Sequence, residues 1–485
     1  MSKTERPIKR KRLIESLNDG RNVWIDGEKV TELHKHPAFA ETLQTLERLF
    51  NQLHDPNMRD KIGFVSPITG EYVHVAFLVP KTVDDLYARK RAFTLWANET
   101  LGMMSRLAES GRSYITGWYA SREEFQKYDC HFAEKITRFY EQIRDEDRIA
   151  ISVVADPQVN RAKLQTEQDD PDLLLRVVKE TEEGVVIRGA KVLATAAPYA
   201  HDIIVHSFLP FTEKDAQYAN LFAVPANLPG VHIICRDSFA TLDKKKHPLS
   251  SRFEEMDAIV VFDDVLVPWE RVLLHRNPEG AMYAMRHKRD NSLTNHQSVI
   301  RLIAKMEFVA GLAFSIAEAI GVDRYLNVEE RLGELVIQIE TLKSLLISAE
   351  ARVKKDAYGT LWPEPLSLRI AIDLGASYYP RAIEILQQIG AGGFLQVPSS
   401  GLEENESVKA FIDKYCSGAN VSAEAKRKLF KLAWDLIGSE FGSRQELYER
   451  FFSKDPVRNY ATRYREYDKE PLKKRVEQFI QKYSE

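Results

Sequence analysis

The feature that most constrains this chain is a change of hydrophobic periodicity, from helical to strand-like and back to helical. Between residues 149 and 272, apolar runs of strand length are separated by Pro, Gly and Asp. On both sides, apolar residues recur every three or four positions, as they do in amphipathic helices. Strands gathered between helical regions are typical of α+β folds, not of alternating βαβ units. The sequence therefore predicts a β domain flanked by helical domains.

The change of period divides the chain into three regions. We predict a helical domain over residues 1–148, a β domain over 149–280, and a helical bundle with its tail over 281–485. The bundle has the strongest pattern, because apolar side chains between residues 302 and 320 are spaced by four and three. The sequence contains no G-x-G-x-x-G or Walker motif, which argues against a βαβ nucleotide fold.

Charge and cysteine content exclude several functions. The net charge of -3 lacks the basic excess of nucleic-acid-binding proteins. No window approaches the roughly 18 apolar residues of a transmembrane helix, and the basic first twelve residues precede no apolar run, unlike a signal peptide. The three cysteines, Cys130, Cys235 and Cys416, are too far apart to predict a disulfide framework or a metal site. We therefore expect a cytoplasmic protein without metal, nucleic-acid or membrane partners.

The stretch GAKVLATAAPYAHDIIVHS, residues 189–207, has small side chains at its centre. The flanking residues 185–187 and 203–205 are strand-like and suggest a hairpin-like pair of strands. Residues 194–197 would let a flat ligand approach the backbone closely, with Thr195 as its polar contact. Tight packing of a sheet face under a helix is the alternative, and local composition alone favours it.

Four segments together resemble the 4-hydroxyphenylacetate 3-hydroxylase family, the oxygenase components of two-component flavin-dependent monooxygenases. They are PQVNR, GAKVLATAAPYAHDIIV, PLSSRFEEMDAIVVFDDVLVPWERV and LAWDLIGSEFGSRQELYERFF, in the family's order. The resemblance extends from about Ser16 to Asp455. It implies an acyl-CoA dehydrogenase-like architecture: a helical N-terminal domain, a central β domain and a C-terminal helical bundle, assembled as a homotetramer.

The resemblance also implies a cofactor and partners. FAD would lie between the β domain and the bundle, and a separate NAD(P)H-dependent flavin reductase would supply it already reduced. Its reaction with O2 would give a C4a-hydroperoxide, which hydroxylates a small aromatic substrate such as a phenol or aminobenzoate, ortho to the OH or NH2 group. Such a site must exclude water, because the hydroperoxide otherwise decays to hydrogen peroxide.

The family's pattern places FAD against the β domain and the turn SEFGS. Arg161 would bind a phosphate or a ring carbonyl, although a surface ion pair explains this arginine equally well. The residues assigned to FAD by the resemblance are Ser152, Val153, Val154, Gln158, Val159, Asn160, Arg161, Thr195, Ser439, Glu440, Phe441, Gly442 and Ser443.

The resemblance places Arg112 at the substrate end of the flavin, as the arginine of the family's Gly-Arg-Ser-Pro-Asp-Tyr segment. Thr116 replaces the tyrosine of that segment, unless Tyr114 substitutes by a local shift. Ser152 replaces the histidine that binds the phenol in 4-hydroxyphenylacetate hydroxylases. These departures predict that the pocket takes a different aromatic compound.

His296 is the candidate general base. It lies in line with Val299 and Ile303 on an inward helix face, and related chlorophenol and nitrophenol hydroxylases have a substrate-deprotonating histidine at this place. An ordinary pKa near 6.5 suits this role, and a buried structural histidine is the alternative. His206 and Ser207 fall where the family has a mobile loop over the substrate.

Three alternatives remain at this point. A dehydratase of the 4-hydroxybutyryl-CoA type needs cysteine ligands for an iron-sulfur cluster, but this chain has no C-x-x-x-C motif and has Ile303 where the dehydratase has a cysteine. An acyl-CoA dehydrogenase needs a carboxylate base against the flavin, which we do not find in the sequence. A flavin-binding protein without enzymatic activity is also compatible with the sequence.

Overall fold

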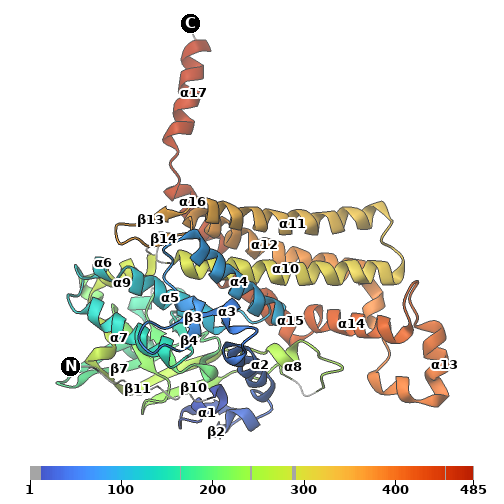
Figure 1. Cartoon of the computed structure of the whole chain (residues 1–485), viewed down its shortest axis with the longest axis horizontal. Coiled ribbons are helices and arrows are strands. Elements are labelled where there is room, and N and C mark those ends of the chain that lie inside the picture. Colours follow the sequence, from blue (N-terminus) through green and yellow to red (C-terminus); the bar gives the residue numbers. More distant parts are fainter. Residues whose placement is uncertain (1–11, 164, 241–242, 287–290, 454, 484–485) are drawn as a thin grey trace.

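The computed structural model describes residues 12–483 except 164, 241–242, 287–290 and 454, so the basic residues 1–11 lie outside the described part. Figure 1 shows the strands gathered at the lower left and the long helices running side by side across the upper part of the body. Helical, β and helical regions follow one another along the chain, which confirms the predicted α+β, acyl-CoA dehydrogenase-like architecture.

The N-terminal region is mainly helical. α4 begins at a capping box formed by Thr82 and Asp85, and it buries Phe93 and Trp96. The hairpin β1–β2 instead leaves the helices, and β1 pairs parallel with β10 (Val231–Cys235) of the central sheet. The helices are α1 (Leu13–Ser16), α2 (Ala40–Asn51), α3 (Arg59–Ile62), α4 (Val83–Glu99), α5 (Ala108–Ala120), α6 (Arg122–Phe125) and α7 (Phe132–Asp145). The strands are β1 (Asn22–Ile25), β2 (Glu28–Val30), β3 (Gly63–Val65) and β4 (Tyr72–His74).

The central region forms two sheets. One is six-stranded, in the order β2-β1-β10-β11-β7-β6, and the other is four-stranded, in the order β12-β9-β8-β5. Their remaining strands are β5 (Ala150–Val153), β6 (Arg176–Glu180), β7 (Gly184–Lys191), β8 (Asp202–Val205), β9 (Leu221–Pro225), β11 (Ala258–Pro268) and β12 (Val272–Leu274).

The hairpin predicted around residues 194–197 is wrong, because its two strands belong to different sheets. β7 pairs with β11 and β6, whereas β8 pairs with β5 and β9. Leu193 and Ala196 take left-handed backbone conformations (φ 55° and 65°), which turn the chain from one sheet to the other. The small side chains therefore form a turn between the sheets and not the tip of a hairpin.

The C-terminal region is a bundle around α10, which is buried on most of its faces. α10 packs against α4 and α5 as well as against α11, α12 and α14, so it joins the two helical regions. The helices are α9 (Pro278–Arg286), α10 (Ser292–Ile320), α11 (Leu326–Ala351), α12 (Pro365–Gly390), α13 (Glu406–Tyr415), α14 (Ala423–Ile437), α15 (Glu440–Phe451), α16 (Pro456–Glu466) and α17 (Glu470–Tyr483), whereas the short α8 (Ser250–Phe253) lies in the central region between β10 and β11. A short ladder joins β13 (Lys354–Lys355) to β14 (Leu361–Trp362).

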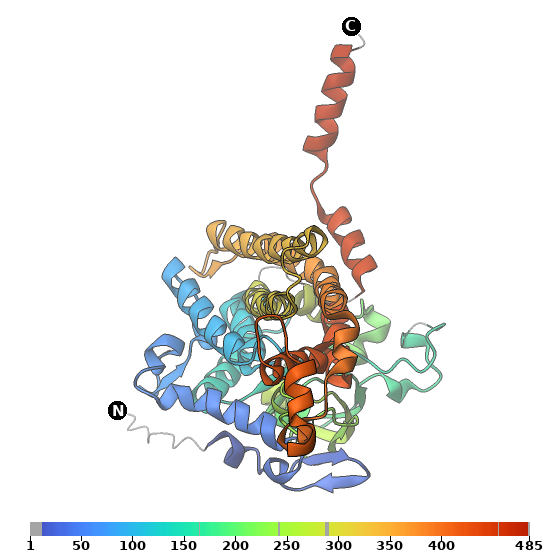
Figure 2. The same ribbon diagram turned by 90° about the vertical axis from the view of Figure 1, so that its right-hand side faces the viewer.

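The last helix stands apart from the bundle. Figures 1 and 2 both show α17 extending away from the body, and none of its described side chains is buried. Of the helices in the described part of the chain, none is both long and apolar enough to cross a membrane.

Candidate active site

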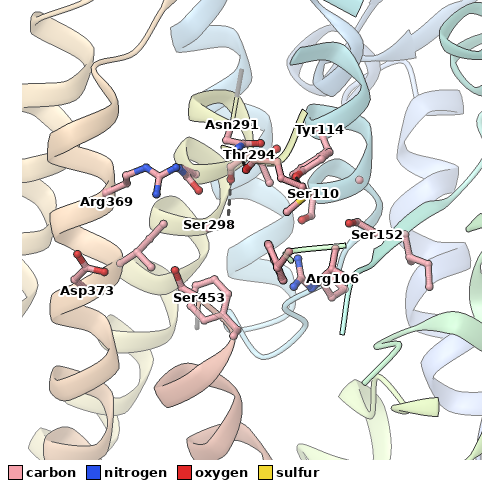
Figure 3. Close-up of a pocket in the computed structure, with 18 of the residues that line it drawn as sticks. Arg106, Ser110, Tyr114, Ser152, Asn291, Thr294, Ser298, Arg369, Asp373 and Ser453 are labelled. Carbon is pink, nitrogen blue, oxygen red and sulfur yellow. Dashed lines mark hydrogen bonds between the residues drawn. The ribbon is translucent and has the colours of Figure 1, made fainter. Parts of the chain in front are cut away.

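A cavity of about 170 Å³ lies where the three regions of the chain meet (Figure 3). Its walls come from α5, β5, the first turns of α10, the start of α12 and the α15–α16 junction. Its polar lining residues are Arg106, Ser110, Tyr114, Ser152, Asn291, Thr294, Asn295, Ser298, Arg369, Asp373, Ser453 and Arg463. Apolar side chains such as Ile151, Phe208 and Met285 complete the lining. A small ligand would therefore meet a mixed surface, in which polar and charged side chains outnumber the apolar ones.

The close packing of α5 on β5 forms one side of this pocket. Gly111 of α5 lies so near the strand that a Cβ atom there would be 1.8 Å from the Ala150 carbonyl oxygen. Only a residue without a side chain allows this approach. The contact brings Ser110 of α5 and Ser152 of β5 to the same cavity.

A chain of ionic contacts leads from the pocket to Thr195. The Arg106 backbone amide donates to Glu255, which also forms an ion pair with Arg444 at 3.2 Å. Arg444 donates to both carboxylate oxygens of Asp257, at 2.9 and 2.8 Å, and the Thr195 hydroxyl donates to the same carboxylate at 2.6 Å. Although burial opposes ionisation, Arg444 lowers the pKa of Asp257 below its ordinary value. This network fixes Thr195 beside the first turns of α15.

The structure brings the predicted cofactor segments to one region. An antiparallel bridge between Ala155 and Val192 joins the segment after β5 to the segment before Thr195. The apolar side chains of Val159 and Leu193 on these segments are 71% and 75% exposed. The segment SEFGS forms the N-cap and first turn of α15, and Arg444, which reaches Thr195 through Asp257, follows it in the same helix.

Within these segments, the side chains differ in accessibility. Val153 and Phe441 are buried in the core, so only their backbones are available to a ligand. Gly442 is required by the fold, because a Cβ atom there would lie 2.0 Å from the Leu436 carbonyl oxygen. The side chains that face solvent are those of Gln158, Val159, Asn160, Arg161, Glu440 and Ser443, and those of Val154, Thr195 and Ser439 are half-buried.

The structure does not bring Arg112 or Thr116 to the pocket. Arg112 is 0% exposed, pairs with Asp147 at 2.9 Å and lies over the rings of Phe50 and Phe77. The Thr116 hydroxyl is buried and donates to the Arg112 carbonyl at 2.8 Å. This geometry gives Arg112 a structural role, and it does not support the substrate contacts predicted for the two residues.

Three arginines that the sequence pattern did not single out line the pocket, Arg106, Arg369 and Arg463, and Arg106 is the one that lies beside α5. It lies just before α5, and Ser110 follows it one turn later, so both reach the cavity (Figure 3). The spacing of four residues equals that of arginine and tyrosine in the Gly-Arg-Ser-Pro-Asp-Tyr segment. Aligning the family segment with SRLAES (residues 105–110), and not with GRSYIT (residues 111–116), would have identified Arg106 and Ser110 from the sequence.

His296 faces away from the pocket, so the prediction that it deprotonates the substrate is not supported. Its Nε2 lies 2.9 Å from a carboxylate oxygen of Glu350 on α11, and Lys90 of α4 pairs with the same carboxylate at 2.7 Å. Burial lowers the pKa of His296, although Glu350 opposes this shift. The side chain therefore joins α10 to α11, in the structural role that we gave as the alternative.

Ser152 and Tyr114 do line the pocket, and His206 lies behind them. The Ser152 hydroxyl is 2.7 Å from Nε2 of His206, whose ring centroid is 5.8 Å from that of Tyr114. Burial lowers the pKa of His206 to about 3, so the ring is neutral. The buried Ser207 hydroxyl donates to Asp156 at 3.1 Å. His206 and Ser207 begin the irregular segment that follows β8, and the next residue, Phe208, lines the pocket. Their own side chains contact Ser152 and Asp156 behind the pocket wall, and a role of this segment as a loop over the substrate stays a prediction.

Comparison with known proteins places this geometry in a family. Residues 10–274 match the N-terminal domain of 4-hydroxyphenylacetate 3-hydroxylase, and residues 288–481 match its C-terminal domain. The chain is 39% identical to the oxygenase component of 4-hydroxyphenylacetate 3-monooxygenase from Thermus thermophilus, over 95% of this chain and 94% of the relative. It is also 29% identical to a Rhodococcus 4-nitrophenol 2-monooxygenase oxygenase component, over 93% of this chain and 86% of the relative.

Solved structures show the same relationship. A crystal structure of a 4-hydroxyphenylacetate 3-monooxygenase oxygenase component with FAD and 4-hydroxyphenylacetate superposes with a TM-score of 0.92 at 39% identity, covering 97% of this chain and 98% of that one. An archaeal 4-hydroxybutyryl-CoA dehydratase shares the fold, with a TM-score of 0.83 at 21% identity, over 93% of this chain and 91% of that one. The sequence matches over both domains and the superposition over nearly the whole chain establish that this protein belongs to the 4-hydroxyphenylacetate 3-hydroxylase family.

Proposed function

We propose that this protein is the oxygenase component of a two-component flavin monooxygenase, which hydroxylates a small aromatic compound with reduced FAD and O2. The observation that carries the proposal is the pocket between α5, β5 and α10, which adjoins the predicted FAD-binding segments. The family match supplies the reaction class, because the relatives are named as monooxygenases of aromatic compounds.

The residues beside the pocket fit FAD. Two exposed apolar side chains, Val159 and Leu193, belong to the two segments that the bridge between Ala155 and Val192 joins, and a bound ring system would cover them. Thr294 Oγ1 is a buried polar atom of the pocket without a hydrogen-bond partner in the described part of the chain. We infer that the backbone of residues 152–154 and 158–161, with Thr195 and the 439–443 turn, holds the cofactor. Reduced FAD, when bound, supplies the electrons that activate O2 for transfer of one oxygen atom to the ring.

The protein's own residues would orient the substrate. The Arg106 guanidinium enters the pocket and would stabilise negative charge that develops on the ring oxygen or nitrogen. Ser110 and Ser152 would bind the ring OH or NH2 group, and the neutral His206 would keep the Ser152 hydroxyl oriented. We infer a substrate other than 4-hydroxyphenylacetate, since small hydroxyls occupy both places where we expect a tyrosine and a histidine in hydroxylases of that compound.

We also propose a homotetramer, because α17 exposes an apolar stripe that a second copy would cover. Its members recur at helical spacing and are Leu472, Val476, Phe479, Ile480 and Tyr483. Light scattering on the full chain should give the mass of four subunits, and deletion from residue 470 should give a smaller species. A tetramer that persists after the deletion would contradict this role for α17.

A cytoplasmic location and an NAD(P)H-dependent reductase partner remain predictions.

Oxygen consumption tests the proposed function. The purified protein is mixed with NADH, FAD, a flavin reductase and a panel of phenols and aminobenzoates. We expect at least one aromatic compound to be hydroxylated, with product formed in proportion to the O2 consumed. Release of hydrogen peroxide with every aromatic compound would contradict the proposal.

A further inference from the structure

Arg369 is a pocket residue that the proposed function leaves unused. It belongs to α12, and Figure 3 shows its side chain extending from that helix toward the cavity, on the side away from Ser152. Its Nε is buried and has no hydrogen-bond partner in the described part of the chain. Asp373, one turn further along α12, is already paired with Arg463 of α16 at 2.8 Å. The carboxylate nearest in sequence is therefore engaged by another arginine.

The surroundings of Arg369 make its positive charge less favourable when no anion is bound beside it. Burial lowers its pKa, and the like charge of Arg463 lowers the pKa further, against the smaller opposing effects of Glu466 and Asp373. Among the described lining residues, Arg106, Arg369 and Arg463 are basic and Asp373 is the acidic one. An anion entering this side of the pocket would thus meet a local excess of positive charge.

Two buried arginines with a structural role in this protein are paired with carboxylates, and a third, Arg89, is held by backbone carbonyl oxygens and the Ser113 hydroxyl. Arg112 pairs with Asp147 at 2.9 Å, and Arg301 pairs with the buried Glu449 through both of its terminal nitrogens. Arg369 has no such partner in the described part of the chain, although it faces the same interior as the substrate pocket. A guanidinium in this state is suited to bind a planar carboxylate with two parallel hydrogen bonds.

We infer that Arg369 is the anion-binding residue of this pocket and selects aromatic substrates that carry a carboxylate group. The carboxylate lies at the α12 side, and the ring extends toward Ser110 and Ser152, which bind its OH or NH2 group. The inference rests on the proposed function for the site, and it makes Arg369 a specificity-determining residue. A neutral phenol lacks the group that Arg369 binds.

Binding of benzoate and benzamide to the purified protein, measured by calorimetry, tests this inference. The two ligands have nearly the same shape and differ in charge, and neither has to be hydroxylated for binding to be measured. We expect the wild-type protein to bind benzoate about tenfold or more tightly than benzamide, as a charge-assisted bidentate contact predicts. Arg369→Gln should remove this preference, because benzoate loses a charge-assisted contact and benzamide loses at most a neutral one.

Arg381→Gln is the matched control, because it removes a positive charge from the same helix at a residue that pairs with Glu334 and does not line this pocket. It should keep the wild-type preference for benzoate. Equal binding of benzoate and benzamide by the wild-type protein would overturn the inference without any variant. An unchanged preference in folded Arg369→Gln would do the same.

A cofactor phosphate is the other anion that Arg369 could hold, so the affinity for FAD is measured on the same variants. Loss of FAD affinity in Arg369→Gln with unchanged benzoate binding would assign Arg369 to the cofactor and overturn the inference. A benzoate preference that depends on Arg369 would support it even if no aromatic compound were hydroxylated. Failure of the oxygenase proposal is therefore distinguishable from failure of the anion site.

Discussion

Replacement of Arg112 by glutamine is expected to lower the free energy of unfolding by about 3–5 kcal/mol, the usual cost of breaking a buried ion pair. The variant leaves the Asp147 carboxylate without its partner beside the core, and it removes the guanidinium from between the rings of Phe50 and Phe77. It also removes the donors to the carbonyl oxygens of Asp147 and Arg148. Denaturant unfolding, followed by circular dichroism, measures this loss.

Arg106→Gln is the matched comparison, because it changes the same residue type at a position that lines the pocket. Its backbone amide keeps the bond to Glu255, so we expect stability within about 1 kcal/mol of the wild type. We expect hydroxylation to fall about 100-fold or more, since a donor to developing charge is lost. The reverse result, a folded but inactive Arg112→Gln and an active Arg106→Gln, would restore the assignment made from the sequence.

Arg106 and Arg112 show that a sequence pattern predicts poorly which side chain of a segment points into a pocket. The resemblance placed the segment around Arg112 at the substrate end of the flavin, and this segment reaches the pocket through Arg106 and Ser110 instead. Two arginines six residues apart fit the pattern. The direction of each side chain depends on how α5 packs on β5, and this contact joins residues about 40 positions apart in sequence. The role of general base predicted for His296 is not supported for a related reason. α10 is buried on most of its faces, so the apolar residues around His296 in the sequence could not distinguish the side toward the pocket from the side toward α11.

The order of helical and β regions was predictable, because the periodicity of apolar residues records which face of each element is buried. Strand pairing was not predictable in the same way. β7 and β8 are separated by only ten residues yet join different sheets, and β1 crosses from the helical region to pair with β10. Such pairings depend on contacts between distant residues, which no local pattern records.

Replacement of Gly111 by alanine is expected to destabilise the protein by about 3 kcal/mol or more, at the upper end of overpacking effects. The new methyl group would lie 1.8 Å from the Ala150 carbonyl oxygen, which is backbone and cannot move aside as a side chain can. α5 would have to shift from β5, and Ser110 would move away from Ser152 across the pocket. We therefore expect hydroxylation to fall even at temperatures where the variant stays folded.

Gly333→Ala is the control, since Gly333 lies within α11 and a Cβ atom there meets no heavy atom within 4 Å. Alanine in a helix interior is favoured over glycine by roughly 0.5–1 kcal/mol, so this variant should unfold at slightly higher denaturant concentration than the wild type. Both variants replace glycine by alanine, and we expect the free energy of unfolding to fall in Gly111→Ala and to rise slightly in Gly333→Ala. If Gly111→Ala were as stable and as active as Gly333→Ala, the contact between α5 and β5 could not be what positions Ser110 and Ser152 in the pocket.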